Sequence, residues 1–375
     1  MIRTEIDKAI RLLRSFFQEH PWGFPLALLA LALVTYGVFI TQLGFYWDDW
    51  PPLMFVHMAD KTAVWQYFSY DRPFQSWTYA ILLPICRDSA FAWQLSVILF
   101  RWTAALGLYF TFLLIFPRQK TLWQWTAALF VVFPGFSDQY ASVAFGSHFL
   151  TYTVFGLSLL TLVLAMKDRK RFWIFYPLSL LLTGVSLFTM EYFVGLEAIR
   201  PVLIFLVLAR SEEKKARTLL RTIKFWGAYI VIFGIYLYWR MVLFPAAMGG
   251  ASGNYPFIFE QVITTPFSTF LAFGNTIYSD LRFMLLSAWT DRLLPLDASV
   301  VTMTLWLSLL IGIATAWIYY HFLSRWQKAE NAALSGRETG SNVLLDFTPD
   351  YWLTGPRYYN INNLVTILTR LWRGA

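Results

Sequence analysis

Residues 24–50 read FPLALLALALVTYGVFITQLGFYWDDW, an apolar run of membrane length that ends in two adjacent carboxylates. A helix needs about 20 apolar residues to cross the hydrocarbon core of a bilayer. Acidic side chains at the edge of such a run are costly to place, and they usually serve a function. The stretch therefore predicts a membrane protein with a functional site beside Asp48 and Asp49.

Composition points to the same class of protein. The 375 residues are 58% hydrophobic and 14% charged, whereas a soluble domain has about 25% charged residues. We predict an all-α polytopic membrane protein with about eight transmembrane helices and a large extracytoplasmic first loop that carries juxtamembrane helices. The predicted spans are 25–45, 91–116, 122–136, 147–166, 172–190, 192–209, 225–243 and 300–321. Glu191 separates the fifth from the sixth.

Basic residues fall in alternate loops between these spans. They are Arg3, Lys8, Arg11 and Arg14, then Arg118 and Lys120, then Lys167, Arg169, Lys170 and Arg171, then Arg210, Lys214, Lys215, Arg217, Arg221 and Lys224, and finally Arg325 and Lys328. The positive-inside rule makes these loops cytoplasmic. We therefore expect a multi-pass protein of the plasma (inner) membrane, with a cytoplasmic N-terminus and an extracytoplasmic site. The net charge of +8 then reflects topology and attraction to anionic lipid, and no nucleic-acid partner is needed to explain it.

The chain divides into three predicted regions. Residues 1–24 have apolar residues at helical spacing between Arg and Lys, which predicts an amphipathic helix on the cytoplasmic surface. A basic tail that only sets the orientation is the alternative. Residues 25–321 form the transmembrane domain, with a first outer loop at 46–90 and a last outer loop at 244–299. Residues 322–375 form a polar, cytoplasmic C-terminal segment.

Four acids and a histidine on the predicted outer face are candidate site residues. Asp48 and Asp49 have no basic neighbour within three residues, which favours a functional role over a structural ion pair. Asp138 is either a catalytic acid or the cap of the fourth span. His148 is a general base, a metal ligand or a structural residue. Glu191, in a very short outer loop, is expected to line a cavity.

Two arginines on the same face are candidates for binding a phosphate. Arg240 lies near the outer end of the seventh span, and Pro73 biases Arg72 toward an extended backbone. A guanidinium grips phosphate through two parallel hydrogen bonds. The alternatives are an interfacial anchor for Arg240 and an ion pair with Asp71 for Arg72. Glu197 and Arg200, three residues apart, are expected to form a structural ion pair.

Five segments together resemble the GT-C superfamily of polytopic glycosyltransferases, and most closely its protein O-mannosyltransferase and aminoarabinose-transferase-like branch. The resemblance covers about residues 25–245. Its segments are Phe45-Tyr-Trp-Asp-Asp-Trp50, Tyr70-Asp-Arg-Pro-Phe74, Phe133-Pro-Gly-Phe-Ser-Asp138, Thr189-Met-Glu191 and Tyr236-Leu-Tyr-Trp-Arg240. The chain departs from the family pattern at Met190, which replaces a lysine, and at Asp138, which stands where the family has a glutamate.

The resemblance implies a membrane glycosyltransferase that takes a sugar from a polyprenyl-phosphate donor. An acid of the first loop, Asp49 in preference to Asp48, would deprotonate the acceptor hydroxyl. The sugar would be transferred with inversion to an acceptor glycan, lipid or protein, in cell-envelope glycosylation. Arg240, Arg72 or both would hold the leaving phosphate. A divalent cation bound by Asp48, Asp49 and Asp138 is left open. The alternatives are a transporter or flippase of lipid-linked sugars, and an inactive structural relative in an envelope-assembly complex.

Overall fold

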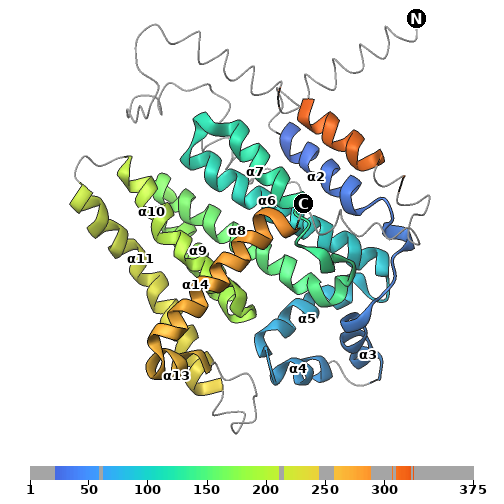
Figure 1. Cartoon of the computed structure of the whole chain (residues 1–375), viewed down its shortest axis with the longest axis horizontal. Coiled ribbons are helices and arrows are strands. Elements are labelled where there is room, and N and C mark those ends of the chain that lie inside the picture. Colours follow the sequence, from blue (N-terminus) through green and yellow to red (C-terminus); the bar gives the residue numbers. More distant parts are fainter. Residues whose placement is uncertain are drawn as a thin grey trace, which may run out of the picture.

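The computed structural model describes residues 22–58, 62–210, 215–244, 257–288, 306, 310–321 and 324, and it contains no strand within these ranges (Figure 1). The predicted N-terminal and C-terminal segments, 1–24 and 322–375, fall almost wholly outside the described residues.

Five helical segments are long and apolar enough to cross a membrane. They are Ala90–Ile115, Ser142–Lys167, Arg169–Thr189, Glu191–Ala209 and Lys215–Leu243. They coincide with the second, fourth, fifth, sixth and seventh predicted spans. These helices indicate a membrane-embedded protein.

Two other predicted spans are shorter in the structure than the sequence suggested. Helix α2 (Gly23–Tyr36) has 14 residues and α7 (Lys120–Val132) has 13. The chain leaves α2 at Gly37 and turns through the 3-10 helix η1 (Ile40–Gln42) before the site sequence begins. Residues 310–321 of the last predicted span are helical, and most of 300–309 lies outside the described residues.

Residues 46–90, the predicted first outer loop, contain several short helices. They are η2 (Trp47–Asp49), α3 (Trp50–Met58), α4 (Thr62–Ser69), η3 (Pro73–Gln75) and α5 (Ser76–Cys86). The longer helices follow as α6 (Ala90–Ile115), η4 (Pro117–Gln119), α7, η5 (Ser137–Tyr140), α8 (Ser142–Lys167), η6 (Arg169–Arg171) and α9 (Phe172–Thr189). After these come η7 (Glu191–Phe193), η8 (Gly195–Ala198), α10 (Ile199–Ala209), α11 (Lys215–Tyr238) and the π-helix η9 (Trp239–Leu243).

The long apolar stretch between α9 and α10 is broken where expected. Met190 has an extended backbone, with φ −148° and ψ 126°, and η7 begins at Glu191. The expected Glu197–Arg200 ion pair is also present. It is joined by a hydrogen bond of 2.7 Å from Arg200 Nη2 to Ser158 Oγ on α8.

Helix α8 lies at the centre of the bundle and is buried along most of its length. It crosses α6 at a contact of small residues. A Cβ on Gly107 would lie 2.9 Å from the backbone carbon of Gly156, and a Cβ on Gly156 would lie 3.1 Å from the Ala104 oxygen. Small residues allow two membrane helices to approach this closely. The position of α8 relative to α6 therefore depends on these two glycines.

The two ends of the bundle differ in charge. At one end, Lys167 donates to the Leu114 carbonyl and Arg210 lies 4.6 Å from the Phe116 ring, so the basic turns after α6, α8 and α10 meet. At the other end, Tyr79 donates to the Val143 carbonyl and Trp77 to Thr189, so the first-loop helices cover α8 and α9. The predicted site residues thus share the end opposite the basic turns.

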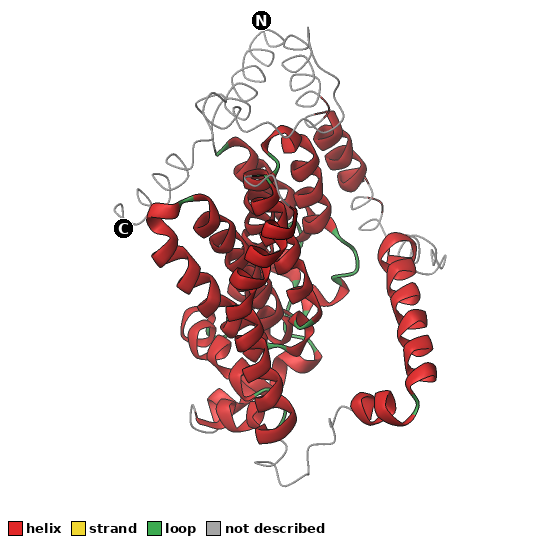
Figure 2. Cartoon of the chain, turned by 90° about the vertical axis from the view of Figure 1, so that its left-hand side faces the viewer, coloured by secondary structure: helices red, strands yellow, loops and turns green. Residues whose placement is uncertain are grey.

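Helices α13 (Phe257–Thr264) and α14 (Pro266–Arg282) lie apart from the bundle, at the right of Figure 2. Nearly all residues of α14 are exposed, including Phe267 and Tyr278. They belong to the predicted last outer loop, 244–299.

Gly107→Ala should destabilise the fold by about 1–3 kcal/mol, because its methyl group would meet the α8 backbone and α6 would have to move. The matched control is Gly227→Ala on α11, where the added Cβ meets nothing within 4 Å. Thermal unfolding in detergent compares the two variants. Equal melting temperatures would contradict the close α6–α8 crossing.

The orientation prediction can be tested by cysteine labelling from either side of sealed vesicles. Asp138→Cys should react only from the extracytoplasmic side, and Lys170→Cys only from the cytoplasmic side, since basic loops stay inside. Both positions are exposed. The native Cys86 is buried and can be replaced by Ala beforehand. Labelling of both positions from the same side would refute the topology.

Candidate functional site

The Phe45–Trp50 segment, here named the acidic loop, is held against the start of α8 by Asp49. Asp49 Oδ1 accepts the N–H groups of Val143 at 2.8 Å and Ala144 at 2.9 Å, and Oδ2 accepts the Tyr46 N–H at 3.0 Å. The side chain is completely buried. Asp49 therefore caps a helix whose Val143 lies 94 residues later in the chain.

Helix α8 needs this distant cap because its own N-cap residue is Ala141, which has no side-chain acceptor. The first backbone N–H groups of a helix lack intrahelical partners and carry partial positive charge. A carboxylate can accept hydrogen bonds from these N–H groups and also balance their partial positive charge. Burial raises the pKa of Asp49, the three N–H donors lower it, and the Asp48 charge raises it, with a net increase over the ordinary value.

Asp48 lies on the same turn as Asp49 but is exposed. The preceding residue, Trp47, has φ +41°, in the left-handed region that bulky side chains rarely adopt. The Tyr46 and Trp47 rings lie 5.3 Å and 5.5 Å from the Tyr140 ring, both edge-on. The acidic loop is thus fixed on two sides, by α8 and by η5.

Asp138 belongs to the same region. It is exposed within η5, two residues before Tyr140, whose ring the acidic loop contacts. It does not cap the fourth span, because α8 begins at Ser142 with Ala141 as its N-cap. That sequence alternative is wrong: the cap comes from Asp49. The structure brings Asp48 and Asp138 into contacting segments.

Asp71, Arg72, Glu191 and Arg240, here named the charge cluster, join three segments at the same end of the bundle. Arg72 Nε donates to both Glu191 oxygens at 3.1 Å and 3.0 Å, and its Nη2 donates to Oε1 at 2.6 Å. Its Nη1 lies 3.0 Å from Asp71 Oδ2. The hydrogen bonds with Glu191 raise the pKa of Arg72 above its ordinary value, so its charge is permanent.

Arg240 completes the charge cluster from η9. Its Nη1 donates to the Asp71 carbonyl at 2.8 Å, and its Nη2 lies 3.7 Å from the Asp71 carboxylate. The two proposed phosphate-binding arginines are therefore adjacent, although 168 residues separate them in the chain. Two positive and two negative charges balance in the cluster. An anion that binds there must displace a carboxylate or use a donor that is only weakly engaged.

The start of α8 connects the acidic loop to the charge cluster. Gln75, three residues after Arg72, donates to Ser147 Oγ at 2.8 Å. The His148 ring stacks on Tyr192 at 5.8 Å, and the Tyr192 hydroxyl accepts from Arg72 Nη2 at 3.1 Å. His148 Nδ1 is buried without a hydrogen-bond partner in the described part of the chain. Both groups of candidate residues thus lie around the first two turns of one helix.

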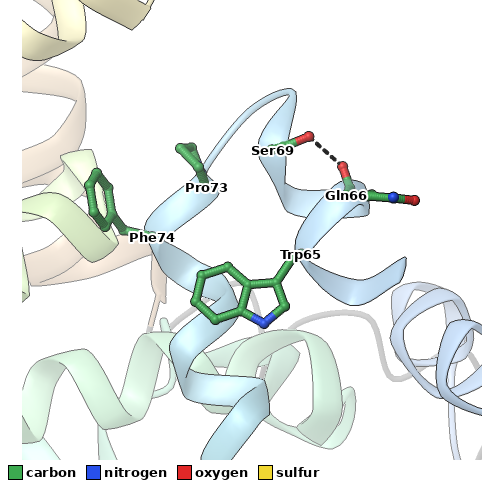
Figure 3. Close-up of a pocket in the computed structure, with 5 residues that line it drawn as sticks. All are labelled: Trp65, Gln66, Ser69, Pro73 and Phe74. Carbon is green, nitrogen blue, oxygen red and sulfur yellow. Dashed lines mark hydrogen bonds between the residues drawn. The ribbon is translucent and has the colours of Figure 1, made fainter. Parts of the chain in front are cut away.

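A pocket of about 330 Å³ lies beside the charge cluster, on the first-loop helices. Trp65, Gln66 and Ser69 of α4 and Pro73 and Phe74 of η3 line it (Figure 3). Phe74 also packs 5.0 Å from Trp239, the neighbour of Arg240. None of the predicted site residues lines this pocket, so a single cavity shared by Asp48, Asp49, Asp138 and Glu191 stays a prediction.

The three aspartates do not form a ready metal site. Among the described residues, no group of three or more His, Cys, Asp or Glu side chains lies close enough to hold an ion. Both Asp49 oxygens are already occupied by backbone N–H groups. These residues do not fit the divalent cation that some superfamily members use.

Sequence reasoning missed the role of Asp49 as a cap and the contribution of Tyr192. Helix capping is usually sought one residue before the helix, and nothing in the sequence links residue 49 to residue 143. Tyr192 follows Glu191 in the chain, but nothing in the sequence indicates its contact with Arg72. The sequence indicates the pairing of Arg72 with its neighbour Asp71, which is present, but it gives no indication of the pairing of Arg72 with Glu191.

A double-mutant cycle on Arg72→Ala and Glu191→Ala should give a coupling free energy of about 1–3 kcal/mol, because the pair is bidentate and half-buried. The control cycle uses Arg171 and Asp168, an i,i+3 pair whose contact is longer, at 3.7 Å, with an expected coupling of about 0.3–0.5 kcal/mol. Chemical or thermal unfolding in detergent gives both values. A coupling no larger than the control would show that the Arg72–Glu191 pair does not hold η3 and η7 together.

A comparison with models of known protein families finds no match, and a comparison with curated proteins finds no significant match. The geometry of the residues is therefore the basis for a function.

Proposed function

We propose that this protein is a membrane glycosyltransferase that moves a sugar from a polyprenyl-phosphate donor to an acceptor hydroxyl on the extracytoplasmic face. The observation that carries the proposal is the position of the acidic loop and the two adjacent arginines around the start of one helix, α8. Glycosyl transfer from a lipid phosphate needs a carboxylate for the acceptor and cations for the leaving phosphate. The resemblance to the GT-C superfamily supports the same reaction.

The proposed step is a single displacement. A first-loop carboxylate, Asp48 or Asp49, takes the proton of the acceptor hydroxyl while the acceptor oxygen attacks the anomeric carbon. The new C–O bond forms as the bond from the anomeric carbon to the phosphate oxygen breaks, and that electron pair stays on the polyprenyl phosphate. The transition state has oxocarbenium character, and the configuration inverts.

The leaving phosphate would be held by Arg240 and Arg72. Arg240 is the more available of the two, because its contact with the Asp71 carboxylate is long, at 3.7 Å. Arg72 would have to exchange part of its bidentate contact with Glu191 for the phosphate. The need for this exchange would explain why the charge cluster is neutral overall. A neutral site does not attract anions strongly until the donor places its phosphate close to Arg240.

Two other functions remain as alternatives. A flippase for lipid-linked sugars would use the arginines but would break no glycosidic bond. An inactive structural relative in an envelope-assembly complex would need neither charge group. Release of polyprenyl phosphate separates the enzyme from both alternatives.

The test uses purified protein in liposomes with a panel of polyprenyl-phosphate-linked hexoses and pentoses, and with membrane extract as the source of acceptors. We expect release of polyprenyl phosphate with at least one donor. The double variant Asp48→Asn, Asp49→Asn should release it about 10²–10⁴-fold more slowly, the usual effect of removing a positioned base. Full activity of this variant would contradict the mechanism. Movement of intact donor between leaflets without release would indicate a flippase.

Arg240→Ala should raise the donor KM at least as strongly as it lowers kcat, because it removes a phosphate contact present in the bound donor as well as in the transition state. Arg118→Ala is the control, since it lies at the opposite, basic end of the bundle. Steady-state kinetics with the active donor measure both variants. An unchanged donor KM and kcat in Arg240→Ala would exclude this arginine from the donor site.

A further inference from the structure

The two adjacent carboxylates of the acidic loop occupy different surroundings. Asp49 has no exposed surface, and its two oxygens accept three backbone N–H groups at 2.8–3.0 Å. A general base must come within hydrogen-bond reach of the proton that it takes. An acceptor hydroxyl cannot reach Asp49 unless the start of α8 separates from the acidic loop.

Asp48 has the opposite surroundings. It is exposed, and within the described part of the chain its carboxylate makes no hydrogen bond or ion pair. Its backbone is nevertheless well fixed, because Asp49 is anchored on one side and Trp47 is held at φ +41° beside Tyr140 on the other. Strained backbone at a non-glycine residue persists where the surrounding structure enforces it, often at a functional site.

We propose that the two acids have separate roles: Asp48 takes the proton from the acceptor hydroxyl, and Asp49 is a positioning residue that holds Asp48 in place by capping α8. This inference rests on the proposed function, because it assigns the base within that reaction. It also explains why two like charges lie side by side. The Asp49 charge is offset by the helix N-terminus, so only Asp48 presents a carboxylate to solvent.

The structural half can be tested without any activity. In sealed vesicles and a Cys86→Ala background, Asp48→Cys should react with a membrane-impermeant maleimide, and Asp49→Cys should stay unlabelled until the protein is denatured. Asp49→Asn should lower the melting temperature by about 5 °C, since its amide places N–H donors where a carboxylate oxygen accepted. Asp48→Asn should leave the melting temperature unchanged. Equal labelling of the two positions, or equal stability of the two Asn variants, would overturn the assignment.

The catalytic half uses release of polyprenyl phosphate, at a temperature well below the melting point of each variant. Asp48→Asn should lower kcat by about 10²–10⁴-fold and remove the fall in kcat/KM at acidic pH. Asp49→Asn should lower kcat by a smaller factor, roughly tenfold, and should keep that acidic limb, because the base is still present. If the fall in kcat/KM at acidic pH were lost in Asp49→Asn and kept in Asp48→Asn, the roles of the two acids would be reversed. The labelling and melting results stand even if no donor is turned over, so failure of the proposed function is distinguishable from failure of the Asp49 assignment.

Discussion

The contact between the Asp49 carboxylate and the first N–H groups of α8 determines where the acidic loop lies. It joins a loop that follows the first apolar segment to the central helix of the bundle. Charge-assisted hydrogen bonds of this kind are worth about 1.5–3 kcal/mol each, before the favourable interaction with the helix dipole. Since α8 has no local cap, the loop and the helix depend on each other.

The other outer contacts extend this arrangement from the start of α8. Tyr79 bonds to the Val143 carbonyl and Gln75 to Ser147, so η3 and α5 follow the α8 surface. Arg72 then reaches Glu191 and, through Asp71, Arg240. The exposed Asp48 and the two arginines are thus linked, through these contacts, to the first two turns of α8.

The sequence was sufficient for several features that depend on hydrophobic length and loop composition. The five long helices, the break at Glu191 and the short helices of the first loop follow from apolar run length and aromatic loop composition. The predicted lengths of α2 and α7 were too long, because an apolar run in the sequence shows which residues can be buried but does not show where the helix ends. The assignment of the candidate residues to the extracytoplasmic face stays a prediction.

The partners of those residues could not be foreseen. Asp49 meets Val143 only once the first loop packs against the start of α8, and no local feature of the sequence indicates that contact. The same holds for Arg72, whose local neighbour Asp71 was visible in the sequence while Glu191, 119 residues away, was not. The sequence shows that Asp48 and Asp49 are both acidic, but it does not show that Asp49 is the buried one.

Hydrogen–deuterium exchange of a peptide that covers Val143 and Ala144 tests the central contact most directly. These amides should be protected in the native protein and in Asp48→Asn. They should exchange roughly ten- to a hundredfold faster in Asp49→Asn, as expected when about 1.5–3 kcal/mol of local stability is lost. Equal protection in all three proteins would contradict the claim that Asp49 fixes the acidic loop to α8.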